Sequence, residues 1–269
     1  MLLESNLFED IWIRHGIPSL KTGSGKFFDK LGDVYEDYFI ALFEPDRIAQ
    51  YNKILKGWAT ANSMDEEVAC YVLTKASVSH IDSVEVPKVP KRESGGEPKT
   101  DVWVLINGEE HVKASIKQSK AKAIAVAEFD VETIAKEVGF THDTELVSLL
   151  ERFQLDASAK NFTKEEKKRL RTLFTPYRRL FLNWVLSGSK EESSENPQHA
   201  NLMVMFKTDG EGKPAGLGIE TLSECVDYLT ERTSGFGTGL SFTYATGSKS
   251  KKIQFKAPVI KPQDSVVWV

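Results

Sequence analysis

Three residues near the middle of the chain have the types and spacing of a metal-dependent phosphodiesterase site. Asp101 precedes an apolar run over residues 102–106, and Ser115 and Lys117 lie near the end of the segment that follows. Asn107-Gly108 between the two segments is a turn signal, which predicts a β-hairpin. A carboxylate on one strand can hold a divalent cation, while a lysine on its neighbour orients the attacking water and balances phosphate charge.

The position of Asp101 relative to Lys117 depends on the register of this hairpin. Side chains alternate between faces along a strand, so Ser115 and Lys117 share a face and Ile116 points away. Pairing Asp101 with Lys117 brings the polar groups together and leaves a three-residue loop, 108–110. A two-residue loop starting at the same glycine puts Asp101 opposite Ile116, on the wrong face. We therefore expect an odd-length loop, a β-bulge, or an Asp101 just outside the paired strands.

The bulk composition is that of a globular chain without membrane segments. Its 269 residues are 41% hydrophobic and 28% charged, enough for one large domain or two small ones. It has no run of 18 apolar residues and no signal-peptide pattern at its N-terminus, so we expect a cytoplasmic protein with no membrane partner. Cys70 and Cys225 are far apart in helix-like runs, which favours two buried thiols over a disulfide.

The distribution of charge is more informative than the net charge of −4. Residues 112–127 contain four lysines and no acid, and residues 232–263 contain six bases and no acid. The remaining residues carry 25 bases and 39 acids, a net −14. Two acid-free basic segments in an acidic chain predict a localised surface for a polyanion. The alternative is that they are solvated surface strands.

Periodicity and turn residues predict one α/β domain over residues 1–269, with no internal repeat and no clear linker. We expect an N-terminal helical part, a nuclease core, a helical segment and a C-terminal β-rich part, over 1–78, 79–140, 141–190 and 200–269. The predicted helices cover 4–15, 27–43, 63–75, 123–138, 143–153 and 221–231, with others starting near Thr163 and Pro176. The predicted strands outside the hairpin cover 80–89, 202–206 and 215–220.

The C-terminal segment has the residue types of a DNA-reading surface. Glycines at 235, 237 and 239 let backbone approach a ligand closely. Lysines that can contact phosphates are interleaved with short hydrogen-bonding side chains that can contact base edges: Thr243, Thr246, Ser248 and Gln254. The alternative is an edge hairpin kept soluble by its lysines.

Several stretches, taken together and in matching order, resemble the MspI family of type II restriction endonucleases, which are PD-(D/E)xK nucleases. They are residues 31–36, 95–101, 116–117, 127–134, 159–163, 235–240 and 255–256. The resemblance covers most of the chain. It implies an α/β fold with the PD-(D/E)xK core, a mixed β-sheet flanked by helices.

The resemblance also implies roles for individual residues. Asp101 matches the metal-binding Asp of the family and Lys117 its catalytic Lys. Ser115 stands where the family has Asn and most such nucleases have Glu or Asp, and Gln118 stands where the family has His. A hydroxyl is a poor Mg²⁺ ligand beside a carboxylate, so we expect Ser115 to act through water or to leave room. Glu36, beside the apolar face of the 27–43 helix, is either a surface acid or a second metal ligand.

The resemblance places a further set of residues at the DNA. Thr243, Ala245, Thr246, Ser248, Gln254 and Lys256 fall where the family approaches the recognition bases. For contacts with the DNA we also expect Lys99, Lys120, Lys122, Lys249 and Lys251.

The implied function is Mg²⁺-dependent cleavage of duplex DNA at a short palindromic G/C-rich site, CCGG or a relative, leaving 5′-phosphate ends. Mn²⁺ is expected to substitute for Mg²⁺. A monomer or weak dimer would act in the bacterial cytosol, where a cognate DNA methyltransferase protects the host. One alternative is a sequence-specific DNA-binding protein whose cleavage is weakened or lost because of Ser115. Another is an enzyme of the same core that reads modified bases.

Overall fold

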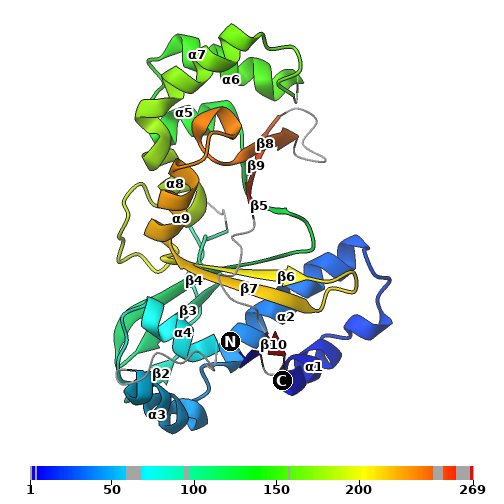
Figure 1. Ribbon diagram of the computed structural model, residues 1–269, viewed down its shortest axis with the longest axis vertical. Helices are drawn as coiled ribbons and strands as arrows, with labels where there is room; N and C mark the ends of the chain where they lie inside the picture. Colours follow the sequence, from blue (N-terminus) through cyan, green and yellow to red (C-terminus); the bar gives the residue numbers. More distant parts are fainter. Residues whose placement is uncertain are drawn as a thin grey trace. The chain divides into compact units, whose positions relative to one another are not determined.

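The computed structural model describes residues 2–3, 5–58, 68–93, 97–156, 158–244, 251–258 and 267–268, drawn in colour in Figure 1. Contacts divide the chain into two compact units. Unit 1 comprises Met1–Ala121, Glu195–Thr221 and Val259–Val269, and unit 2 comprises Lys122–Ser194 and Leu222–Pro258. Each unit combines separated segments, whereas the four predicted parts are consecutive. That the chain acts as a single domain stays a prediction.

Unit 1 is built on a mixed five-stranded sheet of order β2-β3-β4-β6-β7. β4 pairs parallel with β6 and the other neighbours pair antiparallel, which confirms the predicted mixed sheet. The helices are α1 (Ser5–Arg14), α2 (Gly25–Ala41), α3 (Ile48–Trp58) and α4 (Val68–Lys75), with short 3-10 turns at Ile17–Ser19 and Pro45–Arg47. The strands are β1 (Leu2–Leu3), β2 (Val84–Glu85), β3 (Val102–Ile106), β4 (Glu109–Ser119), β6 (Leu202–Thr208), β7 (Pro214–Thr221) and β10 (Val267–Trp268).

Helix α2 packs its apolar side into the same core as one face of this sheet. Ser24 caps the helix by accepting a hydrogen bond from the Phe27 amide. Alternate residues of β3, namely Val102, Val104 and Ile106, are buried in that core. Each such side chain stabilises the fold by roughly 1.5–3 kcal/mol relative to an exposed one. The predicted apolar side of α2 is confirmed and consists of Leu31, Val34, Tyr35, Tyr38 and, just beyond the helix, Leu42.

A β-bulge in the β3–β4 hairpin sets the register that places Asp101 on the same face as Lys117. Asn107 and Gly108 form a two-residue turn with φ of 57° and 79°, and Ile106 pairs with Glu109. The register then shifts by one residue, so that Val102 pairs with Ala114. The predicted three-residue loop is therefore wrong, and so is the direct pairing of Asp101 with Lys117. The predicted bulge is confirmed, as is an Asp101 just outside β3.

Two other predicted elements are confirmed only in part. The strand expected over residues 80–89 is reduced to β2, with Pro87 close behind it. The helix expected over residues 123–138 is a strand, β5 (Ala123–Phe129), followed by helix α5 (Val131–Val138). Burial explains the second error, because Ile124 and Val126 are buried and β5 pairs with β9, which outweighs the helix propensity of its alanines. Helix α3 was not predicted. The first residues of the helix expected over 63–75 lie outside the described residues, and its remainder is α4.

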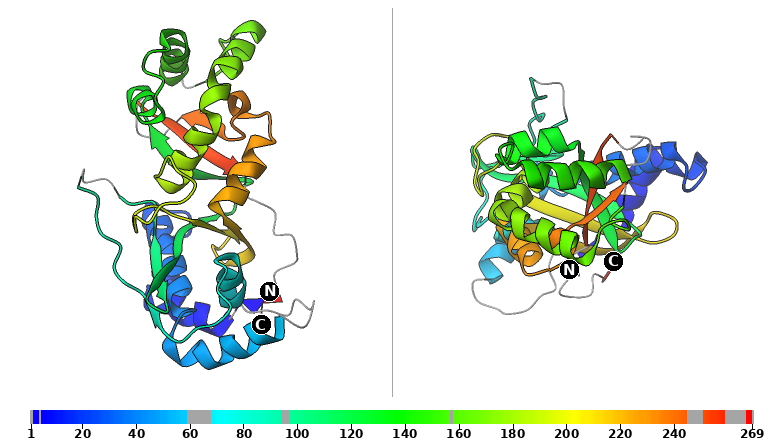
Figure 2. Two further views of the ribbon diagram at one scale, coloured as in Figure 1. Left: turned by 90° about the vertical axis from the view of Figure 1, so that its left-hand side faces the viewer. Right: turned by 90° about the horizontal axis from the view of Figure 1, so that it is seen from above.

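Unit 2 contains an antiparallel three-stranded sheet of order β5-β9-β8, with the helices of the unit grouped around it (Figure 2). Its other helices are α6 (Thr144–Asp156), α7 (Lys164–Phe174), α8 (Arg178–Ser187) and α9 (Leu222–Thr230), with 3-10 turns at Thr175–Tyr177 and Gly235–Gly237. Strands β8 and β9 are Ser241–Tyr244 and Ile253–Pro258. Aromatic rings from α6, α7, α8 and the strands pack together in its interior. Cys70 in unit 1 and Cys225 in unit 2 are buried and form no disulfide with each other, as predicted.

Candidate active site

The hairpin brings the carboxylate of Asp101 against the amine of Lys117. The Lys117 Nζ atom lies 2.7 Å from Asp101 Oδ2 and also donates to the carbonyl of Ile116 at 3.0 Å. The backbone N–H of Ile116 donates to the same Asp101 oxygen at 2.6 Å. Both side chains are mostly buried, with 20% of Asp101 and 24% of Lys117 exposed. The predicted proximity of these two groups is confirmed.

Ser115 and Gln118 occupy different surroundings on β4. Ser115 is fully buried, and its hydroxyl lies 3.4 Å from Asp101 Oδ2, a long hydrogen bond. Gln118 is half-buried and pairs in register with Phe206 of β6. In the described part of the chain no hydrogen bond joins the Gln118 side chain to Asp101 or Lys117. The geometry therefore groups Ser115 with the pair, and the role of Gln118 stays a prediction.

Glu36 on α2 completes a cluster of three interacting charges. The pKa of Glu36 is raised to about 7, mainly by burial and then by the negative charge of Asp101, while the positive charge of Lys117 opposes the rise. Glu36 and Asp101 also line one cleft, with a volume of about 580 Å³. Glu36 therefore faces a cleft and is not a fully solvated helix-surface acid.

The oxygen atoms around this cleft fit a hydrated divalent ion. Asp101 Oδ1 has no hydrogen bond within the described residues, and Thr100, which also lines the cleft, has a buried hydroxyl without a partner there. Carboxylate oxygens suit Mg²⁺, which keeps several of its waters, and a hydroxyl can hydrogen-bond one of those waters. The described residues contain no cluster of three or more His, Cys, Asp or Glu side chains. The fit is therefore to an ion that completes its shell with water and substrate oxygens.

Gln198 is a positioning residue that the sequence gave no sign of. Its carbonyl accepts hydrogen bonds from the N–H groups of Lys99 and Thr100, at 3.1 and 3.3 Å. Its side-chain amide donates to the carbonyls of Pro90 and Lys91. Gln198 thus links two parts of the loop before Asp101, residues 90–91 and 99–100, although it lies nearly 100 residues further along the chain. Only a three-dimensional structure could reveal it, because no local pattern marks the residue.

The predicted DNA-contacting residues fall into three groups. Lys120, Lys122 and Lys251 are exposed, and Lys99 is half-buried, with a pKa lowered to about 7 by burial and then by the charges of Lys117 and Arg92. Thr243 of β8 pairs with Gln254 of β9, and its hydroxyl lies 3.3 Å from the Gln254 carbonyl. Gln254 and Lys256 are half-buried and alternate with the buried Ile253, Phe255 and Ala257, so they share a face as predicted. Ala245, Thr246, Ser248 and Lys249 lie outside the described residues.

No helix in the described ranges is long and apolar enough to span a bilayer.

Residues 17–257 match the family model for the restriction endonuclease MspI. The type II restriction enzyme MspI of Moraxella sp. is 33% identical over 273 residues, covering 94% of this chain and 98% of that protein. The crystal structure of MspI in complex with its cognate DNA superimposes with a TM-score of 0.80 and 32% identity, over 94% of this chain and 99% of the other. The chain belongs to the MspI family of type II restriction endonucleases.

Proposed function

We propose that this restriction endonuclease uses Mg²⁺, with Mn²⁺ as a substitute, to cut duplex DNA at a short palindromic G/C-rich sequence, CCGG or a relative. Cleavage would leave 5′-phosphate ends. The single observation that carries the proposal is the contact between Asp101 and Lys117 beside the Glu36 cleft. The similar protein MspI was crystallised with its cognate DNA, which supports duplex DNA as the substrate here.

In this proposal Asp101 and Glu36 hold the ion. Asp101 Oδ2 accepts hydrogen bonds from Lys117 and the Ile116 amide, which leaves Oδ1 as the oxygen that would hold the ion. When bound, the ion would supply charge stabilisation at the phosphate and would acidify the attacking water. Lys117, fixed at both Asp101 and the Ile116 carbonyl, holds that water and balances phosphate charge.

Ser115 has a supporting part in the same proposal. Its side chain is fully buried and turned toward Asp101 Oδ2. A buried hydroxyl next to a carboxylate already engaged by two other donors adds little as a ligand. The small side chain of Ser115 would instead leave space beside Asp101 for solvent. The rival function is sequence-specific binding without cleavage, a consequence of having Ser here. The preserved Asp101–Lys117 contact favours cleavage.

Recognition of the sequence is assigned to unit 2. The β8–β9 pair presents Thr243, Gln254 and Lys256, which are half-buried and available from one side. Thr and Gln can contact base edges, and Lys256 a base or a phosphate. The proposal also includes further DNA contacts that rest on the family resemblance and on charge: Ala245, Thr246, Ser248, Lys249, Lys99, Lys120, Lys122 and Lys251. An enzyme reading modified bases would differ by cutting methylated CCGG duplexes in preference to unmethylated ones.

The proposed setting is the bacterial cytosol, with a cognate DNA methyltransferase protecting the host. We propose that the enzyme acts as a monomer or a weak dimer. Sedimentation with and without a cognate duplex would measure this directly.

Incubating a plasmid with the protein and Mg²⁺, followed by run-off sequencing of the ends, tests the proposal. We expect cuts at one short sequence, 5′-phosphate ends, and no cutting by Lys117→Ala. Lys53→Ala, an exposed lysine on α3, is the matched control and should cut normally. Random nicking, or cutting that survives Lys117→Ala, contradicts the proposal. Tight salt-dependent binding with no product at any divalent metal establishes the rival function.

A further inference from the structure

Helix α7 carries a row of basic side chains that the cleavage site does not use. Lys164, Lys167, Lys168 and Arg171 are spaced i, i+3, i+4 and i+7, and all four are exposed. At about 100° per residue these positions fall within one side of the helix, roughly 100° wide. We call these four residues the basic stripe. Leu170 and Phe174 are buried, so the stripe lies beside the core-facing side of α7 and is open to solvent.

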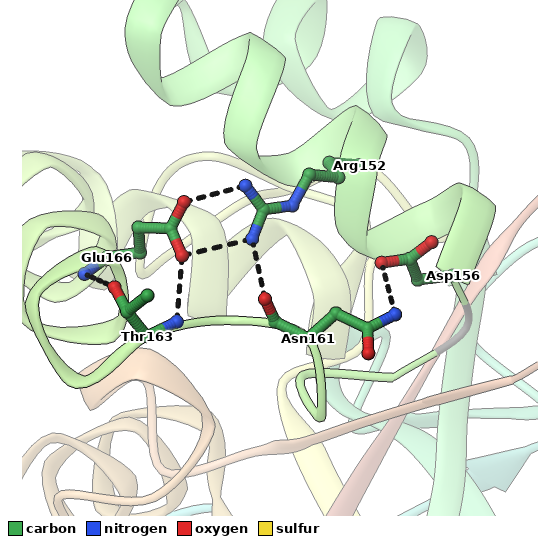
Figure 3. A network of polar contacts seen from close by, with 5 residues as sticks. All are labelled: Arg152, Asp156, Asn161, Thr163 and Glu166. Atoms are coloured by element: carbon green, nitrogen blue, oxygen red, sulfur yellow. Dashed lines mark hydrogen bonds and ion pairs between the residues drawn. The ribbon is translucent and has the colours of Figure 1, made fainter.

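Two of the acids near the stripe are held by other bases. Glu166 accepts two hydrogen bonds from Arg152, at 2.7 and 3.1 Å, and also bonds the Thr163 amide as half of a capping box (Figure 3). These contacts, the Arg152 bond first, lower the pKa of Glu166 to about 2. Glu145 of α6 pairs in the same way with Arg169. Both arginines lie outside the stripe, which therefore keeps its charge.

The lysines of the stripe have no ion pair in the described part of the chain. Glu165, the remaining acid of α7, is three residues before Lys168 and about 60° around the helix from it, but no ion pair joins the two within the described residues. Lys164 and Lys168, like Lys167 and Arg171, are like charges one helical turn apart, an arrangement that destabilises a helix. A row of mutually repelling cations costs stability, and a bound polyanion would remove that cost.

The C-terminal end of the stripe is joined to the glycine-rich turn that leads into β8. The Arg171 guanidinium donates to the Thr233 carbonyl at 3.0 Å. Gly237, with φ of 90°, lies so close to Arg171 that a Cβ there would come within 3.1 Å of the arginine Cγ. The turn begins the acid-free segment 232–263. Within unit 2, the stripe therefore adjoins the turn that leads into the strand pair proposed to contact DNA.

We propose that the basic stripe binds the phosphates of duplex DNA outside the recognition sequence. This inference rests on the proposed function, because it takes duplex DNA as the substrate. Lysine contacts phosphate as a point charge with no demand for a fixed geometry, so the stripe adds affinity without reading bases. Its effect is on binding to long DNA and on the search for a site, both of which fall with salt.

The test uses the triple variant Lys164→Gln, Lys167→Gln, Lys168→Gln in the full chain. Glutamine keeps the helix propensity of lysine and removes the charge. The matched control is Lys26→Gln, Lys53→Gln, Lys56→Gln, three exposed lysines of unit 1. Binding to a duplex of about 30 base pairs without a CCGG site is measured without divalent metal, from about 50 to 200 mM salt.

We expect the slope of log affinity against log salt to become shallower by about 2–3 in the stripe variant, since each lost phosphate contact removes about 0.9. Single-turnover cutting of a short duplex holding little more than the site should stay within about twofold, while cutting of plasmid at limiting enzyme slows several-fold. An unchanged slope overturns the proposal, and so does an equal loss in the control. If the wild type cuts no DNA, the proposed function fails, and the slopes still decide whether the stripe binds phosphates.

Discussion

The Lys117 amine and the Asp101 carboxylate meet at 2.7 Å, although Lys117 lies on β4, Asp101 lies just before β3, and the two are 16 residues apart along the chain. The β-bulge between β3 and β4 makes the contact possible, because it shifts the pairing set by the two-residue turn by one residue and so puts Asp101 on the same face as Lys117. Without that extra residue, Asp101 would face the opposite side of the sheet. The chemistry of the site thus depends on a local irregularity in an otherwise regular hairpin.

Glu36 makes the metal-free protein sensitive to pH. Its pKa is raised from 4.5 to about 7, first by burial and then by Asp101. A raised carboxyl pKa means stability that is full below about pH 4.5 and is lost as the pH rises through about 7. We expect Glu36→Gln to remove this loss, a gain on the order of 2 kcal/mol at pH 8 after allowance for solvent screening.

Thermal unfolding at pH 5 and pH 8 without divalent metal measures this effect. Glu44→Gln, an exposed acid outside the cleft, is the control and should keep the wild-type pH dependence. Equal pH dependence in Glu36→Gln and the wild type would show that Glu36 ionises as an ordinary surface acid.

The buried hydroxyl of Thr100 is expected to lower the stability of the metal-free protein and to assist Mg²⁺ binding. Its buried hydroxyl has no partner among the described residues, and such a group costs roughly 1–3 kcal/mol. Thr100→Val keeps the shape and removes the hydroxyl, so the metal-free protein should gain about 1 kcal/mol. If the hydroxyl holds a water of the bound ion, the same change weakens Mg²⁺ binding in calorimetry. Thr100→Ser should restore binding, and a Val variant with less stability and normal binding would refute the assignment.

Gly239 lies in the glycine-rich turn that leads into β8. Its φ is 80°, and a Cβ there would lie 2.2 Å from the Leu229 carbonyl oxygen, a contact that requires backbone movement. We expect Gly239→Ala to destabilise the protein by about 2–4 kcal/mol. Gly210→Ala, at a position with open space and no positive φ, should change the unfolding free energy by less than about 0.5 kcal/mol. Similar urea midpoints for the two variants would rule out this account of the turn.

Gln254 should affect which sequence is cut more than how fast it is cut. Its side chain is half-buried beside Thr243 on the β8–β9 pair. Losing a bidentate base contact costs about 1–3 kcal/mol of discrimination. We expect Gln254→Ala to narrow the ratio of cutting rates between the preferred site and its single-base variants by about 5-fold to 100-fold. A uniform loss at all sites would instead place Gln254 on a phosphate.

The sequence predicted those features whose causes are local. The contact between the carboxylate and the lysine, the apolar side of α2 and the start of a helix near Thr163 follow from spacing along the chain, and the structure confirms each of them. Residues 123–129 misled the prediction, because alanines favour a helix in isolation while pairing with β9 and burial of Ile124 favour a strand. Such an outcome is decided by distant partners.

Features held by long-range contacts could not be predicted at all. Gln198 reaches Lys99 and Thr100 across nearly 100 residues, and nothing in its neighbourhood marks it. The burial of Glu36 depends on how α2 packs with the sheet, so its sequence position left two interpretations open. Ser115 was expected near the pair, but its complete burial was visible only in the fold.

The most direct test of the central claim is a double-mutant cycle on single-turnover cleavage of a cognate duplex, using Asp101→Asn, Lys117→Met and the combined variant. If both groups act on one phosphodiester, each single change should lower the rate by about 10³-fold or more, and the combined change should do little further harm. Binding of the duplex should persist in all three variants. Losses that multiply, so that the combined variant is slower by the product of the two single effects, would show that Asp101 and Lys117 act independently and would contradict the shared site.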